Sequence, residues 1–140
     1  MKLTLVTPEI FAAVLENISK LKNPNTGRRI GETVYTYADY TDMKVVLSDD
    51  NLSGFAIKPD GDLVSVFSAA FGQGRSKELL TQAISLGAKK LDCFDESGKL
   101  PSLYGSFGFQ EVRRESWNPE YAPENWAGQT PDVVYMELKN

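Results

Sequence analysis

Residues 69–77 read AAFGQGRSK and lie between two segments with different hydrophobic patterns. The preceding residues 63–68, LVSVFS, form an apolar run typical of a buried strand, whereas residues 77–86 carry apolar side chains at helical spacing. A strand, a turn and a helix start in this order can cradle a phosphate, because the first N–H groups of a helix have no partner within it. Gly72 and Gly74 would let a ligand approach the backbone closely.

Two basic residues, Arg75 and Lys77, add positive charge to this turn. The same pattern also fits a tight turn with a solvated basic end and no ligand, so the glycine pair alone leaves both interpretations open. The residues on either side of the turn favour the phosphate site.

The strand before the turn belongs to a predicted hairpin. Residues 53–58 and 62–68 flank Pro59-Asp60-Gly61, which is a strong turn signal, so this part of the sheet is expected to be antiparallel. A dinucleotide-binding fingerprint would instead place a glycine at Lys77, inside a parallel unit. The pattern of a nucleoside-triphosphate loop, G-x-x-x-x-G-K-[ST], does not occur in the sequence.

The residue content narrows the chemistry further. The chain has no histidine and one cysteine, which excludes a Ser/His/Asp triad, a Cys/His pair and an internal disulfide. Cys93 lies in an apolar segment and is interpreted as a small buried strand residue rather than a reactive thiol. The acidic pairs Asp49-Asp50 and Asp95-Glu96 are interpreted as solvated turns, because neither has the spacing of a calcium loop.

Length and charge indicate the class of protein. The chain has 140 residues, of which 41% are hydrophobic and 24% charged, as expected for one globular domain spanning residues 1–140. The net charge of −4 argues against nucleic acid or anionic membranes as general partners. The N-terminal residues do not resemble a signal peptide and no run is long enough to span a bilayer, so a cytoplasmic location is expected.

Hydrophobic periodicity and turn signals predict an alternation of strands and helices, with Arg28 to Asp42 left open between a strand and a loop with a short helical turn. Strands are predicted at residues 3–6, 44–47, 53–58, 62–68, 90–94, 109–115 and 133–138, and helices at residues 8–22, 77–86 and 100–107. Thr7 is the expected N-cap of the first helix. This order predicts an α/β (α+β) domain with a mixed, mostly antiparallel central sheet flanked by helices.

The element order and two local motifs resemble the GNAT superfamily of acyl-CoA-dependent N-acyltransferases. Gly72 and Gly74 match the glycine positions of the family's pyrophosphate loop, [RQ]-x-x-G-x-[GA], although Ala69 stands at the first position. Residues 103–112, LYGSFGFQEV, resemble the family's helix ending L-Y-x-x-x-G-F and the strand that follows. Ser97 replaces a frequent asparagine of the family, so one polar contact to the cofactor arm is not expected here.

The resemblance implies that acetyl-CoA is the cofactor and that its pantetheine arm pairs with the backbone at the end of the hairpin's second strand. A backbone N–H near Phe67 or Ser68 would polarise the acyl carbonyl. In many relatives a tyrosine at the position of Tyr104 protonates the leaving thiolate; the alternative is a packed ring with a surface hydroxyl. The expected cofactor-binding residues are Val66, Phe67, Ser68, Gly72, Gln73, Gly74, Arg75 and Ser76.

The acceptor amine must lose a proton, and without histidine the base would be a carboxylate or a water chain. Asp95 is the first candidate for this base, with Asp92 and Glu111 behind it, although an acid at a strand end often caps a helix instead. Two ring-rich segments, 28–42 and 116–132, are expected to form the acceptor side, or else to pack as minor clusters. Their candidate substrate-binding residues are Tyr35, Tyr37, Trp117, Tyr121 and Trp126, and the first segment also holds Tyr40.

The sequence therefore predicts an N-acetyltransferase that transfers an acetyl group from acetyl-CoA to an amine by direct transfer in a ternary complex. The acceptor, a small molecule or a protein amine, is left open, as is the oligomeric state, with a homodimer as one option. The alternative is a catalytically inactive GNAT-fold module that binds CoA or a partner protein. A longer acyl-CoA or an aminoacyl-tRNA is a further option for the donor, and the negative net charge argues against the RNA.

Overall fold

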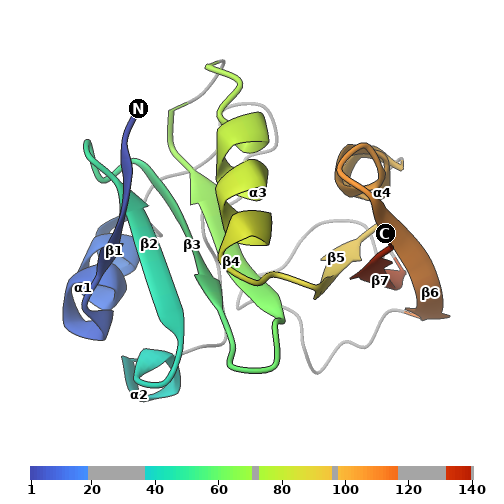
Figure 1. The fold of residues 1–140 in the computed structure, drawn as a ribbon, viewed down its shortest axis with the longest axis horizontal. Helices are drawn as coiled ribbons and strands as arrows, with labels where there is room; N and C mark the ends of the chain where they lie inside the picture. Colours follow the sequence, from blue (N-terminus) through green and yellow to red (C-terminus); the bar gives the residue numbers. More distant parts are fainter. Residues whose placement is uncertain (19–36, 71–72, 96–97, 117–131, 140) are drawn as a thin grey trace. The chain divides into compact units, whose positions relative to one another are not determined.

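A computed structural model describes residues 1–18, 37–70, 73–95, 98–116 and 132–139. The described elements fall into two compact units, Met1–Ala88 and Lys89–Asn140 (Figure 1). Every strand pairing within them is antiparallel. Antiparallel sheets flanked by helices confirm the predicted α/β class, whereas the single domain over residues 1–140 stays a prediction.

The first unit is a four-stranded sheet in the order β1-β2-β3-β4. Its strands and helices are β1 (Leu3–Val6), α1 (Pro8–Ile18), α2 (Tyr37–Tyr40), β2 (Lys44–Ser48), β3 (Ser53–Ile57), β4 (Leu63–Ser68) and α3 (Ser76–Ser85). The segment that the sequence left open contains the short helix α2. Thr7 caps α1 as predicted, since its Oγ1 accepts a hydrogen bond from the Ile10 N–H at 3.4 Å.

The core of the first unit follows from the alternation of side chains between the two faces of the sheet along β2. Val45 and Leu47 pack with Phe11 of α1 in one buried cluster. Val46 lies between them in the strand and is 1% exposed, so it faces the opposite side of the sheet. Leu79, Leu80 and Ala83 form the buried face of α3, which crosses the sheet in front in Figure 1. Helices therefore cover both faces of this sheet.

The second unit is a three-stranded sheet in the order β5-β7-β6 with one helix. Its elements are β5 (Lys90–Phe94), α4 (Lys99–Gly105), β6 (Phe109–Glu115) and β7 (Val133–Leu138). Its buried residues are Leu91, Phe109, Val134 and Met136. All the strands predicted from the sequence are present, with ends that shift by at most a residue. None of the described helices is long and apolar enough to cross a lipid bilayer.

Candidate functional site

Among the strands that the structure describes, β4 is the last of its sheet, so one edge of its backbone has no strand partner in that sheet among these residues. Ala69 N donates to Leu52 O at 2.6 Å, and the register pairs Gly54 with Phe67. The alternation of an antiparallel ladder then turns the N–H and C=O of Phe67 toward β3. Because the C=O and the N–H of one trans peptide group point in opposite directions, the N–H of Ser68 and the C=O of Val66 face the free edge.

The free edge therefore offers one donor and one acceptor on either side of Phe67. An amide-containing chain such as pantetheine can pair with these two groups as an added strand would. Phe67 itself is 4% exposed and its ring lies 6.1 Å from that of Phe11. Of the two backbone donors expected from the sequence, the ladder thus favours Ser68, and Phe67 serves the core.

A β-bulge interrupts β4 just before this edge. The pairing of β3 and β4 shifts register between Gly54 and Ala56, and Ser65 adopts a φ of +54°. Tyr40 of α2 holds the bulged residue, since its hydroxyl lies 2.7 Å from Ser65 Oγ. Bulges of this kind bend a strand and often lie beside functional sites.

Tyr40 belongs to segment 28–42, which was expected to form part of the acceptor side, but its own side chain lies in the core. The side chain is 1% exposed and packs edge to face against Phe11 at 5.1 Å. A ring in this position supports the bulge and the core, and it cannot contact an acceptor from solvent. Tyr37 begins α2, but its side chain and the predicted residues Tyr35, Trp117, Tyr121 and Trp126 lie outside the described residues.

The turn after β4 leads directly into α3. Gly74 has a φ of +63°, which L side chains rarely adopt, and a Cβ placed there would have no atom within 4 Å. Arg75 is the N-cap residue of α3 and makes no side-chain capping hydrogen bond. The first N–H groups of α3, from Ser76 onward, therefore have no side-chain cap from Arg75, and they suit an anion. Gly72 lies outside the described residues.

The side chain of Arg75 differs from the sequence expectation. Its guanidinium forms a two-pronged ion pair with Asp50, with Nη1–Oδ1 at 3.0 Å and Nη2–Oδ2 at 2.6 Å. Asp50 neutralises the positive charge that the sequence analysis assigned to the mouth of the turn. Asp50 is exposed in the β2–β3 turn, as interpreted from the sequence, and this pair in addition holds the pKa of its carboxyl far below the ordinary value.

Tyr104 lies on α4 in the second unit. It is half-buried, and its ring packs edge to face against Phe109 at 6.2 Å. Burial, together with the neighbouring Cys93 and Asp92, raises the pKa of Tyr104 to about 12. The hydroxyl therefore keeps its proton throughout the neutral range, as a general acid must.

Asp95 is engaged in structural contacts that argue against its role as the base. Its Oδ2 accepts a hydrogen bond from Arg114 Nη1 at 2.7 Å, and its Oδ1 accepts one from the Gly98 N–H at 2.9 Å, just before α4. The hydrogen bond from Arg114, strongest among these causes, lowers the pKa of Asp95 and weakens it as a proton acceptor. Glu111 also pairs with Arg114, at 2.6 Å.

Asp92 is the remaining candidate for the base that accepts the amine proton. It is exposed on β5, and its negative charge contributes to the raised pKa values of Cys93, Tyr104 and Tyr135. Cys93 itself is half-buried, and burial, the largest cause, raises the pKa of its thiol to about 12. A thiol that keeps its proton at neutral pH is a poor nucleophile, in agreement with its interpretation as a strand residue.

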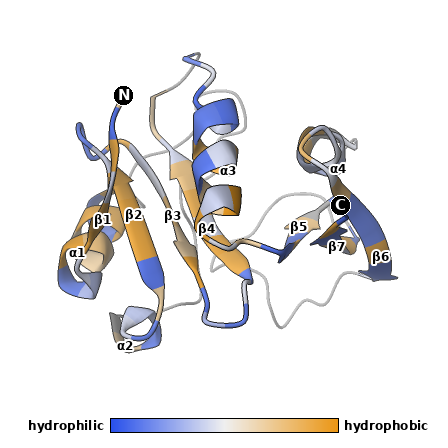
Figure 2. Ribbon diagram, in the orientation of Figure 1, coloured by the Kyte–Doolittle hydropathy of each residue, from blue (hydrophilic) through white to orange (hydrophobic). Residues whose placement is uncertain are grey.

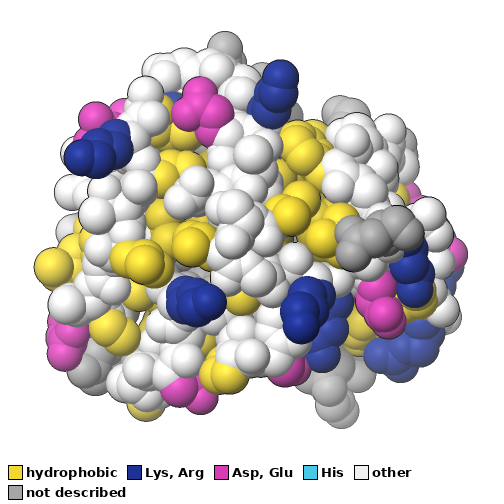
Figure 3. All heavy atoms as spheres, in the orientation of Figure 1, with side chains coloured by type: hydrophobic (Ala, Val, Ile, Leu, Met, Phe, Trp, Pro, Cys, Tyr) yellow, Lys and Arg dark blue, Asp and Glu magenta, His cyan; other side chains and the backbone are white. Residues whose placement is uncertain are grey.

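Lys77 is exposed in the first turn of α3, whereas the charge of Arg75 is paired with Asp50. Figure 3 shows Lys and Arg side chains spread singly over the face of the first unit that is drawn there. Phosphate binding at the start of α3 would therefore depend on backbone N–H groups and the helix dipole more than on a basic patch.

Comparison with solved structures identifies the fold. The chain superposes on an IAA acetyltransferase from Bacillus cereus with a TM-score of 0.65 and 16% identity, covering 98% of this chain and 97% of the other. A GNAT family acetyltransferase from Elizabethkingia anophelis, solved with acetyl-CoA bound, gives 0.59 and 16% over 99% and 97%. A spermidine N-acetyltransferase variant from Vibrio cholerae gives 0.61 and 16% over 99% and 94%. Neither family models nor curated protein sequences gave a match.

The fold is therefore that of the GNAT superfamily, as the sequence resemblance predicted. At these identities the likeness extends to the fold alone. Activity, cofactor and acceptor have to be argued from the residues of this chain.

Proposed function

We propose that this protein is an N-acetyltransferase that transfers an acetyl group from acetyl-CoA directly to an amine. The observation that carries the proposal is the free edge of β4, with Val66 C=O and Ser68 N–H, followed by a left-handed Gly74 and the start of α3. The first unit thus offers backbone groups that can pair with an amide-containing chain, and a helix N-terminus that can bind a pyrophosphate. The strand edge suits the pantetheine arm of CoA, and the helix N-terminus suits its pyrophosphate.

The reaction needs few protein groups. The lone pair of a neutral amine attacks the acetyl carbonyl, a C–N bond forms, the C–S bond breaks, and the departing sulfur takes a proton. Ser68 N–H is the proposed donor to the carbonyl oxygen, where negative charge develops. Tyr104 is the proposed acid for the thiolate, because its hydroxyl carries a proton at every pH near neutrality.

Asp92 is the proposed acceptor of the amine proton, directly or through water, because it is an exposed carboxylate on β5, in the same unit as Tyr104. The proposed acceptor is an amine of a small molecule or of a protein. The names of the structural neighbours, a spermidine N-acetyltransferase among them, favour a small molecule.

Binding measurements can test the proposed cofactor before any acceptor is known. At a concentration of about a hundred times its dissociation constant, acetyl-CoA should add ~2.7 kcal/mol to the free energy of unfolding. Calorimetric titration with acetyl-CoA and CoA, together with a thermal-shift series, measures this effect. The absence of any shift at millimolar acetyl-CoA would contradict the proposal.

A CoA-binding module without catalysis is the second candidate, favoured by the engagement of Asp95 in its structural contacts. Thiol release from acetyl-CoA with a panel of polyamines, aryl amines and lysine peptides separates the two. Amine-dependent release establishes the enzyme, whereas tight binding with no release across the panel favours the module.

A further inference from the structure

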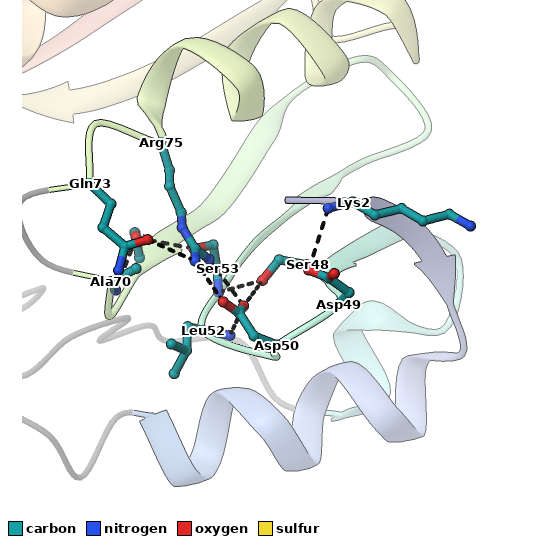
Figure 4. Close-up of polar contacts among 10 residues, drawn as sticks. Lys2, Ser48, Asp49, Asp50, Leu52, Ser53, Ala70, Gln73 and Arg75 are labelled. Carbon is teal, nitrogen blue, oxygen red and sulfur yellow. Dashed lines mark hydrogen bonds and ion pairs between the residues drawn. The ribbon is translucent and has the colours of Figure 1, made fainter.

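The guanidinium of Arg75 is the centre of a polar network in the first unit (Figure 4). Besides its two bonds to Asp50, it donates from Nη1 to Ser53 Oγ at 3.0 Å and from Nη2 to Gln73 Oε1 at 3.0 Å. Arg75 is 11% exposed, which is low for an arginine. Its side chain is thus held on the β2–β3 turn and not extended into solvent.

The partners of Arg75 are themselves fixed by buried groups. Ser48 and Ser53 are the buried polar residues among those described, at 2% and 0% exposure. Ser48 Oγ donates to Asp50 Oδ1 at 2.6 Å and accepts from the Ser53 N–H at 3.1 Å. Leu52 N–H also donates to Asp50 Oδ1, at 3.1 Å. The carboxylate is therefore oriented before Arg75 meets it.

This network bears on the backbone that the proposed function assigns to pyrophosphate. Gln73 and Arg75 flank Gly74, and their side chains are joined to each other across it. Arg75 is also the N-cap residue of α3, so its tether fixes where the helix begins. Ser53 Oγ lies 3.1 Å from Ser68 Oγ, which connects the same network to the end of β4.

We propose that Arg75 is a positioning residue, which together with Asp50 holds residues 73–75 and the start of α3 in the conformation that binds the pyrophosphate of CoA, without contacting the phosphates itself. This inference rests on the proposed function, because it names how the chain prepares the same site. We refer to the bidentate pair of Asp50 and Arg75 as the clamp.

The clamp and a direct phosphate contact by Arg75 predict opposite effects of one substitution. Asp50→Asn removes a negative charge and frees the guanidinium, so a direct contact predicts that CoA binds more tightly. The clamp predicts weaker binding, because the freed arginine no longer holds the turn. Asparagine is nearly isosteric, and its Oδ1 can still accept from Ser48 and Leu52, so the β2–β3 turn keeps its own hydrogen bonds.

Asp49→Asn is the matched control. Asp49 is the adjacent residue, exposed on the same turn, and its carboxylate accepts a long hydrogen bond of 3.4 Å from Lys2 N. Its charge acts on Arg75 through space, yet it forms none of the four hydrogen bonds of the guanidinium. This control therefore measures the effect of the lost charge alone.

The experiment is calorimetric titration of the full chain with CoA, for the parent and for Asp50→Asn, Asp49→Asn, Arg75→Lys and Arg75→Gln. We expect Asp50→Asn to weaken CoA about tenfold, Asp49→Asn to leave it within about twofold, and Arg75→Lys to bind as weakly as Arg75→Gln, because lysine lacks the planar fork. Tighter or unchanged binding by Asp50→Asn, or parent-like binding by Arg75→Lys, would overturn the clamp.

Hydrogen exchange of the ligand-free proteins gives a readout that does not depend on CoA. Amides of residues 73–80 should exchange faster in Asp50→Asn than in Asp49→Asn or the parent. Equal exchange in all three would overturn the clamp, even if affinities differ. Failure of the parent to bind CoA would instead overturn the proposed function, and with it the role of the clamp in that site.

Discussion

Arg75 in the first unit and Arg114 in the second both connect strands through carboxylates, but their surroundings differ. Arg75 forms a two-pronged pair with one carboxylate, is 11% exposed, and donates to the buried Ser53, while the buried Ser48 donates to Asp50. Arg114 contacts three carboxylates, those of Asp95, Glu111 and Asp132, and is 39% exposed. Arg75 thus binds a single carboxylate that is itself 38% exposed, whereas Arg114 shares its charge among three carboxylates that are 23% to 46% exposed.

The difference teaches how ion pairs fix structure. A bidentate pair has a fixed geometry, so it can determine the path of a loop. Exposed pairs are screened by salt and contribute little individually. The strands of the two units also differ in hydropathy. Strands β2, β3 and β4 are mostly hydrophobic in Figure 2, whereas β6 is mostly hydrophilic and buries only Phe109.

The largest effect expected on turnover concerns Tyr104 in the second unit. Tyr104→Phe removes one hydroxyl and should lower kcat about a hundredfold, since a positioned acid contributes on that scale. The dissociation constant of CoA should change little. Steady-state kinetics and calorimetry measure the two quantities, and an unchanged kcat would make Tyr104 a packing residue.

The pH profile sharpens this prediction. Because the pKa of Tyr104 is raised to about 12, the acid stays protonated as the pH rises through the neutral and mildly alkaline range. The kcat of the parent should therefore show no alkaline decrease from this group below about pH 11. A titration of kcat near the ordinary tyrosine value of about 10 would contradict this environment.

The next largest effect concerns Gly74 in the first unit. Gly74→Val introduces a branched side chain into open space at the start of α3, with a φ of +63°, and should weaken CoA about tenfold or more. Gly98→Val is the matched control, because Gly98 has a φ of +71°, precedes α4 and also faces open space. Both variants carry the same kind of strain, so equal loss of CoA affinity would place the effect in stability and not in the phosphate site.

A smaller effect compares the two arginines directly. Arg75→Ala should lower the urea midpoint of unfolding more than Arg114→Ala, because it removes a less exposed arginine that orders a loop. Added salt should reduce the effect of Arg114→Ala more strongly. Urea titrations at low and high sodium chloride measure both, and equal midpoints would remove the distinction between the pairs.

Lowering the pH should remove the contribution of Asp50 to the free energy of unfolding. The folded-state pKa of Asp50 lies below its ordinary value of 3.8, so its pair contributes stability above that value and loses it as the pH falls further. The difference in unfolding free energy between the parent and Asp50→Asn should therefore shrink progressively below about pH 4. A difference that stays constant down to pH 2 would show that the charge of Asp50 does not stabilise the fold.

The smallest effect on the cofactor is expected from the aromatic segment 116–132. Replacing Trp117 and Trp126 by alanine should raise the KM of the acceptor while CoA affinity stays within about a factor of three, or ~0.65 kcal/mol. Kinetics with the identified acceptor and calorimetry with CoA measure the pair of constants. Loss of CoA binding, or unfolding, would assign these rings to the core or the cofactor site.

Local chemistry explains what could be predicted from the sequence. The spacing of Phe11, Leu15 and Ile18 marks the buried face of α1, and Pro59-Asp60-Gly61 closes the β3–β4 hairpin, where Lys58 N donates to Asp62 O at 2.9 Å. Gly74 could be singled out because glycine adopts a left-handed backbone at a lower cost than residues with a side chain. These signals act over a few residues, so periodicity and turn chemistry reveal them.

The tertiary structure alone decided the partners of the charged and polar side chains. Asp50 meets Arg75 across 25 positions, and Tyr40 meets Ser65 across the same separation. Asp95 is occupied by Arg114, 19 positions away. Such pairs depend on strand register, on the bulge in β4 and on which face of each helix is buried. No local pattern encodes these features, because an ion pair or hydrogen bond forms with whichever group the packing of the apolar core brings within about 3 Å.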